Sequence, residues 1–329
     1  MMTTGANRTR SLALVLAICG LVSAACGATT DELFDSKLQT VDQESATQDT
    51  APEPTSDPNC NDADPRPSLR PAGPLPDPGQ MPAGTTMAEI ESRGILRAGV
   101  AADTLLFGSL DPFTAQLEGF DVDLARLVAE AIFGTSSKIE LIPIRSAERI
   151  ERLQQGDVDI VIKTMTINCE RWGQINFSSV YYESGQKLLV RVDSSAKAVD
   201  DLVDETICAL PATTSLKRLQ ESGVATTEAD SWTGCLALFQ QGLADGISTD
   251  DTILAGLVSQ DRYAKVVGDA FSSEPYGVGV AQQNIDLTRF VNAVLEQART
   301  DGTWQELYDK WLADTLGPSG GPPKATYRD

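Results

Sequence analysis

Hydrophobic and polar positions along residues 95–316 follow the alternation expected of strands and helices in turn. Short apolar runs have the length of buried strands, whereas longer stretches with apolar residues three or four apart have helical periodicity. The pattern predicts strands at 95–100, 139–144, 158–162, 186–192, 206–210, 225–231, 246–248 and 276–280. It predicts helices at 120–134, 146–154, 233–241, 252–258, 287–295 and 304–311, and one that opens at 213–215. The expected fold is therefore α/β, with two mostly parallel sheets.

Two crossovers divide this region into lobes. The chain leaves the first group of elements near residues 182–186 and returns to it at 276–280. We therefore assign residues 85–184 and 277–316 to lobe one and residues 185–276 to lobe two, with a hinged cleft between them. Residues 317–329 are rich in glycine and proline, and we expect them to form a flexible tail.

The N-terminus has the pattern of an export signal. Arg8 and Arg10 precede an apolar stretch that is too short for a permanent membrane span. Small residues then lead to Cys26, in the manner of a bacterial lipobox, so residues 1–26 are predicted to be a lipoprotein signal peptide with Cys26 lipidated. The alternative is a cleaved secretory signal that releases a soluble protein.

Residues 27–84 have the composition of a spacer. They contain ten of the seventeen prolines, acids outnumber bases, and no apolar periodicity is present. Such a segment buries too little apolar surface to offset the entropy of ordering. We expect a disordered acidic tether between the lipid anchor and the folded lobes.

Charge and composition exclude several classes of function. The formal net charge is −21, which argues against nucleic-acid binding, because phosphate contacts need a basic surface. The chain has no histidine, which removes His-based zinc sites and Ser-His or Cys-His catalysis. It also lacks a glycine-rich phosphate loop of the Walker or dinucleotide type. We therefore expect a binding protein without metal or cofactor rather than an enzyme.

Polar side chains follow the predicted strand at 158–162. Lys163, Thr164 and Thr166 come directly after it, and Arg171 lies a few residues further on. Ligands of α/β proteins bind outside the carboxyl ends of strands, and a guanidinium matches a carboxylate with two parallel hydrogen bonds. This stretch is therefore a candidate anion site. The alternative for Arg171 is a surface arginine paired with an acid.

Several motifs resemble one family. The segment 166–182, TINCERWGQINFSSVYY, is similar to the T-x-T-x-E-R…FS-x-x-YY signature of the type 3 (amino-acid) periplasmic solute-binding proteins. ILRAGVA at 95–101 and GFDVDL at 119–124 resemble further hallmarks of that family, and the KTM-x-I-x-CER segment resembles its actinobacterial glutamine- and glutamate-binding lipoproteins. The resemblance covers about residues 95–316. It implies the two-lobed type II periplasmic-binding-protein fold.

The resemblance also implies a ligand set. Arg171 with Thr166 and Thr164 is expected to bind an α-carboxylate, and Asp250 an α-ammonium group. Asp250 could instead be a helix N-cap. Thr213, Thr214 and Ser215 open a helix, where free N–H groups favour the same carboxylate. The family usually has glycine where this chain has Ala212.

The side-chain pocket is assigned from similar matches. Ser146 to Ile150 resembles the TSxNRI segment of the family's glutamate/aspartate binders, which implies that Arg149 meets a distal carboxylate. The alternative is a solvated arginine on a helix face. Phe107 and Trp232 fall where the family places ligand-contacting side chains, and either could equally be a core residue. The aspartates of GFDVDL are expected to act as helix dipole and capping residues.

Four cysteines remain after signal removal and lipidation. An even number outside the cytosol suggests two disulfides, for which three pairings are possible. Cys208 lies in a predicted strand and Cys235 just after the neighbouring one, so we predict a Cys208–Cys235 bond. That leaves Cys60 with Cys169. A metal site is the weaker alternative, because the spacings match no zinc pattern.

The sequence as a whole predicts a monomeric, lipid-anchored binding protein on the outer face of the cytoplasmic membrane. Its expected ligand is a free amino acid: glutamate, aspartate, asparagine or glutamine. Its expected partner is an ABC permease, or a membrane sensor coupled to a serine/threonine kinase, as the resemblance to mycobacterial members implies. An exported dehydratase on the same fold is the alternative.

Overall fold

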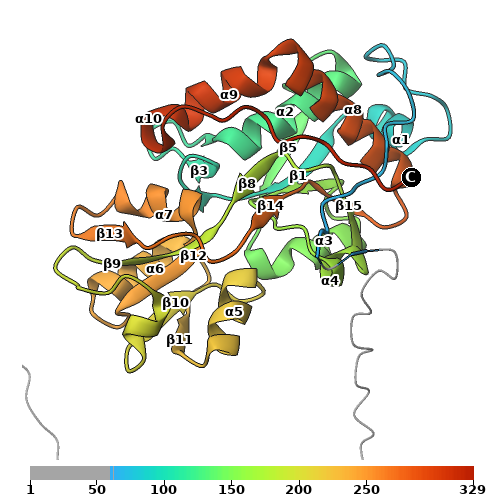
Figure 1. The fold of residues 1–329 in the computed structure, drawn as a ribbon. Helices are drawn as coiled ribbons and strands as arrows, with labels where there is room; N and C mark the ends of the chain where they lie inside the picture. The colour runs from blue at the N-terminus through green and yellow to red at the C-terminus, as the bar shows by residue number, and fades with distance from the viewer. Residues whose placement is uncertain (1–59, 62) are drawn as a thin grey trace, which may run out of the picture. The chain divides into compact units, whose positions relative to one another are not determined.

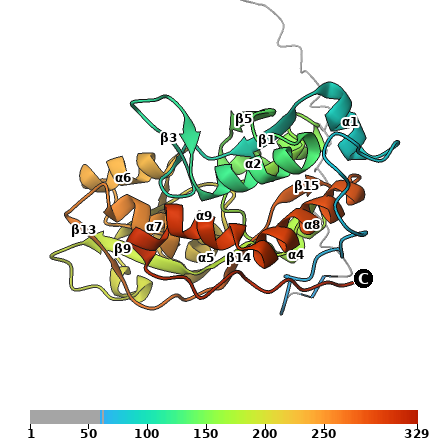
Figure 2. The same ribbon diagram turned by 90° about the horizontal axis from the view of Figure 1, so that it is seen from above.

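The computed structural model describes residues 60, 61 and 63–329. The predicted signal peptide, the lipidation of Cys26 and the tether up to residue 59 lie outside the described residues. Figures 1 and 2 show two lobes, each with its own sheet, joined by a pair of crossover strands.

Lobe one contains a five-stranded sheet in the order β5-β1-β6-β15-β7. Its strands are β1 (Leu96–Val100), β5 (Ile139–Pro143), β6 (Ile160–Ile162), β7 (Ile175–Phe177) and β15 (Gly279–Ala281). Four of them run in one direction, because β15 is antiparallel to both of its neighbours and the other pairs are parallel. The helices of this lobe are α1 (Thr86–Arg93), α2 (Phe120–Phe133), α3 (Arg149–Gln154), α4 (Cys169–Trp172), α8 (Ile285–Asp301), α9 (Thr303–Trp311) and α10 (Ala313–Leu316). A small sheet of β2 (Asp103–Thr104), β3 (Gly108–Leu110) and β4 (Leu117–Glu118) precedes α2.

Lobe two repeats the arrangement in the order β11-β10-β12-β9-β13. Its strands are β9 (Gln186–Arg191), β10 (Thr206–Ala209), β11 (Ala225–Glu228), β12 (Gly246–Asp250) and β13 (Ala264–Val267). Its helices are α5 (Thr214–Ser222), α6 (Trp232–Gln240) and α7 (Asp251–Val258). Here β9 is the reversed strand. The two-lobe α/β fold with mostly parallel sheets is therefore confirmed.

The crossovers are β8 (Tyr182–Ser184) and β14 (Glu274–Tyr276), which pair antiparallel with each other. They connect the lower lobe of Figure 1 to the upper one. The sequence prediction lacked strands β2 to β4, β7, β8 and β13 and helices α1, α4 and α10. Most of these strands are too short for apolar alternation to stand out.

Helix α2 shows why the main prediction succeeded. Phe120, Leu124, Val128 and Ile132 recur every four residues and are all buried in the core of lobe one. The helix ends at Gly134, whose φ of 72° lies in the left-handed region that favours glycine. This periodicity is local, so it can be read from the sequence.

The structure corrects the expectation for the two terminal segments. Residues 63–84 were assigned to a disordered tether and residues 317–329 to a flexible tail, yet the two segments pack together on lobe one. Ser68 forms a β-bridge with Tyr327, and its buried Oγ donates to the carbonyl of Phe177 (2.7 Å). The Oδ1 of Asp329 accepts from the N–H of Arg70 (2.7 Å). Each segment supplies the other's hydrogen-bond partners, which composition alone does not reveal.

Both predicted disulfides are confirmed. Cys208 bonds Cys235 within lobe two, with Cα atoms 5.6 Å apart. Cys60 bonds Cys169, with Cα atoms 5.4 Å apart, and so ties the N-terminal segment to helix α4. The same segment also contacts both crossovers, because the Arg66 guanidinium donates to Glu183 on β8 (2.9 Å) and to Ser273 beside β14 (2.7 Å).

Candidate functional site

A small cavity lies between the lobes. Lobe one and lobe two both line it, and most of its lining is polar or charged. The lining residues are Ser146, Arg149, Thr164, Thr166, Arg171, Thr213, Thr214, Ser215, Trp232, Thr249, Asp250 and Ile253.

Arg171 reaches the cavity from helix α4. The helix is capped by the Asn168 side chain, which accepts from the N–H of Arg171 (2.8 Å). The guanidinium donates to the carbonyl of Thr166 (2.7 Å) in lobe one and to that of Ala212 (3.1 Å) in lobe two. Burial lowers the pKa of Arg171, while the nearby Glu274 carboxylate opposes that shift. Arg171 is thus a buried cation held between the lobes.

Asp250 faces the same cavity from the end of β12. Its Oδ2 accepts a hydrogen bond from the Tyr276 hydroxyl (2.6 Å). Its Oδ1 is buried and accepts no hydrogen bond from the described part of the chain. Asp250 occupies the N-cap position of α7, but its side chain makes no capping hydrogen bond. Desolvation, followed by repulsion from Glu274, raises the pKa of Asp250 to about 8. A cation placed beside Oδ1 would satisfy this carboxylate.

Arg149 is the second buried guanidinium of the cavity. Only 4% of its surface is exposed, so it is not a solvated arginine on a helix face. It donates to three backbone carbonyls, those of Ser146 (2.9 Å), Lys163 (3.3 Å) and Ala212 (3.3 Å). Burial, and then repulsion from Arg171, lowers the pKa of Arg149 to about 9. Its hydrogen-bond partners are neutral, so its charge is available to an anion.

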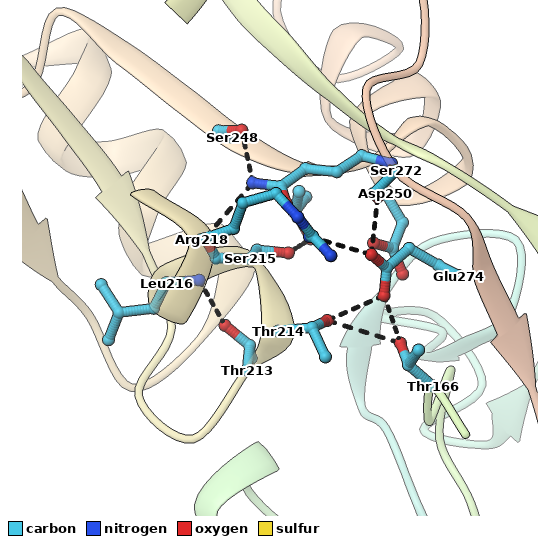
Figure 3. Close-up of polar contacts among 12 residues, drawn as sticks. Thr166, Thr213, Thr214, Ser215, Leu216, Arg218, Ser248, Asp250, Ser272 and Glu274 are labelled. Atoms are coloured by element: carbon cyan, nitrogen blue, oxygen red, sulfur yellow. Dashed lines mark hydrogen bonds and ion pairs between the residues drawn. The ribbon is translucent and has the colours of Figure 1, made fainter. Parts of the chain in front are cut away.

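The start of α5 forms the wall in lobe two (Figure 3). Thr213 caps the helix, because its side chain accepts from the N–H of Leu216 (3.1 Å). Ser215 is buried and its hydroxyl donates to Thr249 (3.2 Å). Ala212 precedes the helix with a φ of 57°, in the left-handed region, at a cost of about 1–2 kcal/mol for a residue with a Cβ. Ala212 adopts this conformation without glycine, and its carbonyl meets both arginines.

The Thr164 backbone is held by a residue whose role the sequence reading missed. Thr164 has a φ of 39°, and its N–H donates to Asp121 Oδ2 (2.8 Å) from α2. Asp121 is fully buried, and desolvation raises its pKa to about 7. Neither aspartate of GFDVDL caps the helix as expected: Asp123 instead accepts from Arg126 (2.7 Å) and Lys310 (2.7 Å).

The two aromatic candidates differ. Trp232 lines the cavity, and its backbone N–H donates to the Asp103 carboxylate of lobe one (2.7 Å). Phe107 does not line it: the ring is fully buried in the core of lobe one, where it packs edge-on against Phe120 and Tyr182. For Phe107 the core alternative is the one that the structure supports.

Other residues of the site were missed in the sequence. Thr249 and Ile253 line the cavity beside Asp250. Glu274 and Tyr276 come from the second crossover, a stretch that was predicted only as a returning strand. Their spacing carries no motif, since they reach the site through the pairing of β14 with β8.

The described residues contain no group of three or more His, Cys, Asp or Glu side chains arranged to hold a metal ion. Within the same residues, no helix has both the length and the apolar character needed to cross a membrane.

Comparison with known proteins places this geometry in context. The family model of the bacterial extracellular solute-binding proteins, family 3, matches residues 96–314. The ABC transporter glutamine-binding protein GlnH of Bacillus subtilis is 34% identical over 232 residues, which cover 70% of this chain and 85% of that protein. The glutamate-binding protein GluB of Corynebacterium efficiens is 31% identical over 245 residues, covering 70% and 81%.

Solved structures agree. A mutant of ArgBP from T. maritima has a TM-score of 0.66 and 30% identity, and the match covers 69% of this chain and 99% of that one. Another structure of that protein is of its arginine-bound form. The similar proteins are thus named for different amino acids. The ligand of this chain therefore has to be inferred from the side chains that line the cavity.

Proposed function

We propose, because this chain belongs to the bacterial extracellular solute-binding proteins of family 3, that its interlobe cavity binds a free amino acid. The observation that carries the proposal is the pair of buried, opposite charges on opposite lobes. Arg171 suits the α-carboxylate and Asp250 suits the α-ammonium group. Thr164, Thr166 and the start of α5 at Thr213, Thr214 and Ser215 surround them, with Trp232 alongside.

The charges of the lining favour an acidic ligand. Arg149 and Arg171 are the basic residues of the lining, and Asp250 is its acidic residue. A glutamate or aspartate zwitterion brings two carboxylates and one ammonium, so each charge meets its opposite. An amide ligand would leave Arg149 without a carboxylate, and a cationic side chain would face it directly. Since buried charges are costly without partners, we infer glutamate or aspartate as the preferred ligand, with their amides weaker.

The wider role follows from the same premise. Relatives include an ABC transporter binding protein, so delivery of the amino acid to an ABC permease is the expected task. The alternative is presentation of the closed form to a membrane sensor coupled to a kinase. In either role the chain would be a monomer attached to the outer face of the cytoplasmic membrane through a lipid on Cys26. The relatives are named as binding proteins, which gives no support to a dehydratase activity.

A calorimetric screen tests the ligand. The purified protein is titrated with each of the twenty amino acids, and we expect glutamate and aspartate to bind tightest, followed by glutamine and asparagine. Arginine and lysine should not bind, because their side chains would meet Arg149. Absence of binding by any amino acid would overturn the proposal, and preference for arginine would overturn the assignment of Arg149.

Affinity should also depend on pH. The pKa of Asp250 is raised to about 8 by desolvation, so below that pH the carboxyl is protonated and must lose its proton to meet the ligand ammonium. Glutamate affinity should therefore rise about tenfold from pH 6 to pH 7, since one proton is released on binding. Titration at both pH values in two buffers of different ionisation enthalpy measures the affinity and the released proton. Equal affinities would show that Asp250 is already ionised.

A further inference from the structure

The carboxylate of Glu274 is the meeting point of four side chains (Figure 3). Its Oε2 accepts from the hydroxyls of Thr166 and Thr214, each at 2.8 Å. Its Oε1 accepts from Ser272 (2.6 Å) and from the Arg218 guanidinium (3.0 Å). Glu274 is completely buried, so these groups supply the hydrogen bonds that such a carboxylate needs.

The two threonines come from different lobes. Thr166 follows β6 in lobe one, whereas Thr214 is the first residue of α5 in lobe two. Their hydroxyl oxygens lie 3.5 Å apart, and one oxygen of Glu274 holds both. Both threonines line the cavity, but Glu274 itself does not. Glu274 can therefore act on a ligand through these threonines, and through the effect of its charge on Arg171 and Asp250.

This geometry exists only while the lobes are close together. If lobe two moves away, Thr166 and Thr214 separate, and Oε2 loses at least one of its two donors. The carboxylate would then remain in the crossover, less well satisfied than before. Hydrogen bonds to a carboxylate are about twice as strong as those between neutral groups. Losing one of them on opening therefore raises the free energy of the open state relative to the closed state.

We propose that Glu274 is a positioning residue that stabilises closure of the lobes and so slows release of the bound amino acid. The proposal rests on the proposed amino-acid binding. The hydrogen bonds of Glu274 to both threonines lower the free energy of the closed state relative to the open state. A residue can shift the equilibrium between two states only through such a difference. Through Thr166 and Thr214 it also fixes one wall of the cavity in each lobe.

Glu274→Gln tests this inference with little change in shape. The glutamine amide has one acceptor oxygen, so it cannot accept hydrogen bonds from the two threonines and from Arg218 at the same time. We expect the dissociation rate of glutamate to rise about 10- to 100-fold while the association rate stays within about threefold, because contacts made after docking act on dissociation. Stopped-flow fluorescence measures both rates. Small-angle scattering of the ligand-free variant should show a less compact protein.

Ser272→Ala is the matched control. It removes another hydrogen bond to Glu274, but Ser272 lies just before β14, and its other hydrogen bond, from the N–H of Gln186 (3.0 Å), stays within lobe two. Its dissociation rate should stay within about threefold of the parent. Should Glu274→Gln fail to fold, Glu274→Asp replaces it: aspartate keeps the charge, but its shorter side chain draws the carboxylate away from the two threonines, so it should also release glutamate faster.

The outcomes separate the two proposals. If the parent protein binds no amino acid, the proposed function fails. If the parent binds glutamate and Glu274→Gln releases it at the same rate, only the inference about Glu274 is overturned. A fall in melting temperature with unchanged rates would also overturn it, because it would show a purely structural role.

Discussion

Replacement of Arg171 by alanine is expected to abolish binding of acidic amino acids and their amides alike. Every amino acid has the α-carboxylate assigned to this guanidinium, and Arg171 is buried with its fork turned between the lobes. Removing one partner of a buried charge pair costs about 2–5 kcal/mol, or roughly 30- to several-thousand-fold in affinity. Isothermal titration with glutamate and with glutamine measures the loss.

Arg171→Lys is the informative companion. It keeps the positive charge but loses the planar pair of donors, so it should bind both ligands more tightly than Arg171→Ala and less tightly than the parent. A melting curve of each variant checks that the protein is folded. Binding of glutamine by Arg171→Ala at the parent's affinity would place the α-carboxylate elsewhere.

Arg149→Ala should instead separate the acids from the amides. Arg149 has the distal group of the ligand as its assigned partner, so glutamate and aspartate lose a charge pair and about 2–5 kcal/mol. Glutamine and asparagine lose a hydrogen bond to an uncharged group, worth about 0.5–1.5 kcal/mol. The ratio of the glutamate to the glutamine affinity should therefore fall, by about 70-fold at the midpoints of the two ranges, which the same titrations measure.

Arg152→Ala is the control for that experiment. Arg152 lies on the same helix, α3, but its side chain is 41% exposed and is paired with Asp157 (2.8 Å) and Glu148 (3.3 Å). Its removal should leave both affinities unchanged. Equal losses for glutamate and glutamine in Arg149→Ala would mean that Arg149 supports the cavity wall rather than choosing the ligand.

Several features could be read from the sequence because they depend on neighbours along the chain. The apolar spacing of Phe120, Leu124 and Val128 defines one face of a helix whatever lies opposite. Arg171 and Asp250 each follow the end of a predicted strand, and the carboxyl ends of the strands in both lobes face the cleft. The Cys208–Cys235 bond joins adjacent elements of one lobe. Local pattern and the usual geometry of α/β units placed these residues, whereas the family resemblance supplied the ligand roles of Arg171 and Asp250.

The remaining features depend on which distant segments meet. Glu274 is 108 residues from Thr166 and 60 from Thr214, and no periodicity links them. The burial of Phe107 and the packing of residues 63–84 against 317–329 were likewise invisible, because composition reports what a segment could bury and not what covers it. The sequence by itself determined the elements, the lobes and the charged residues of the cavity. Only the tertiary structure decided which buried groups join the lobes, since that depends on side chains brought together by the pairing of the two crossovers.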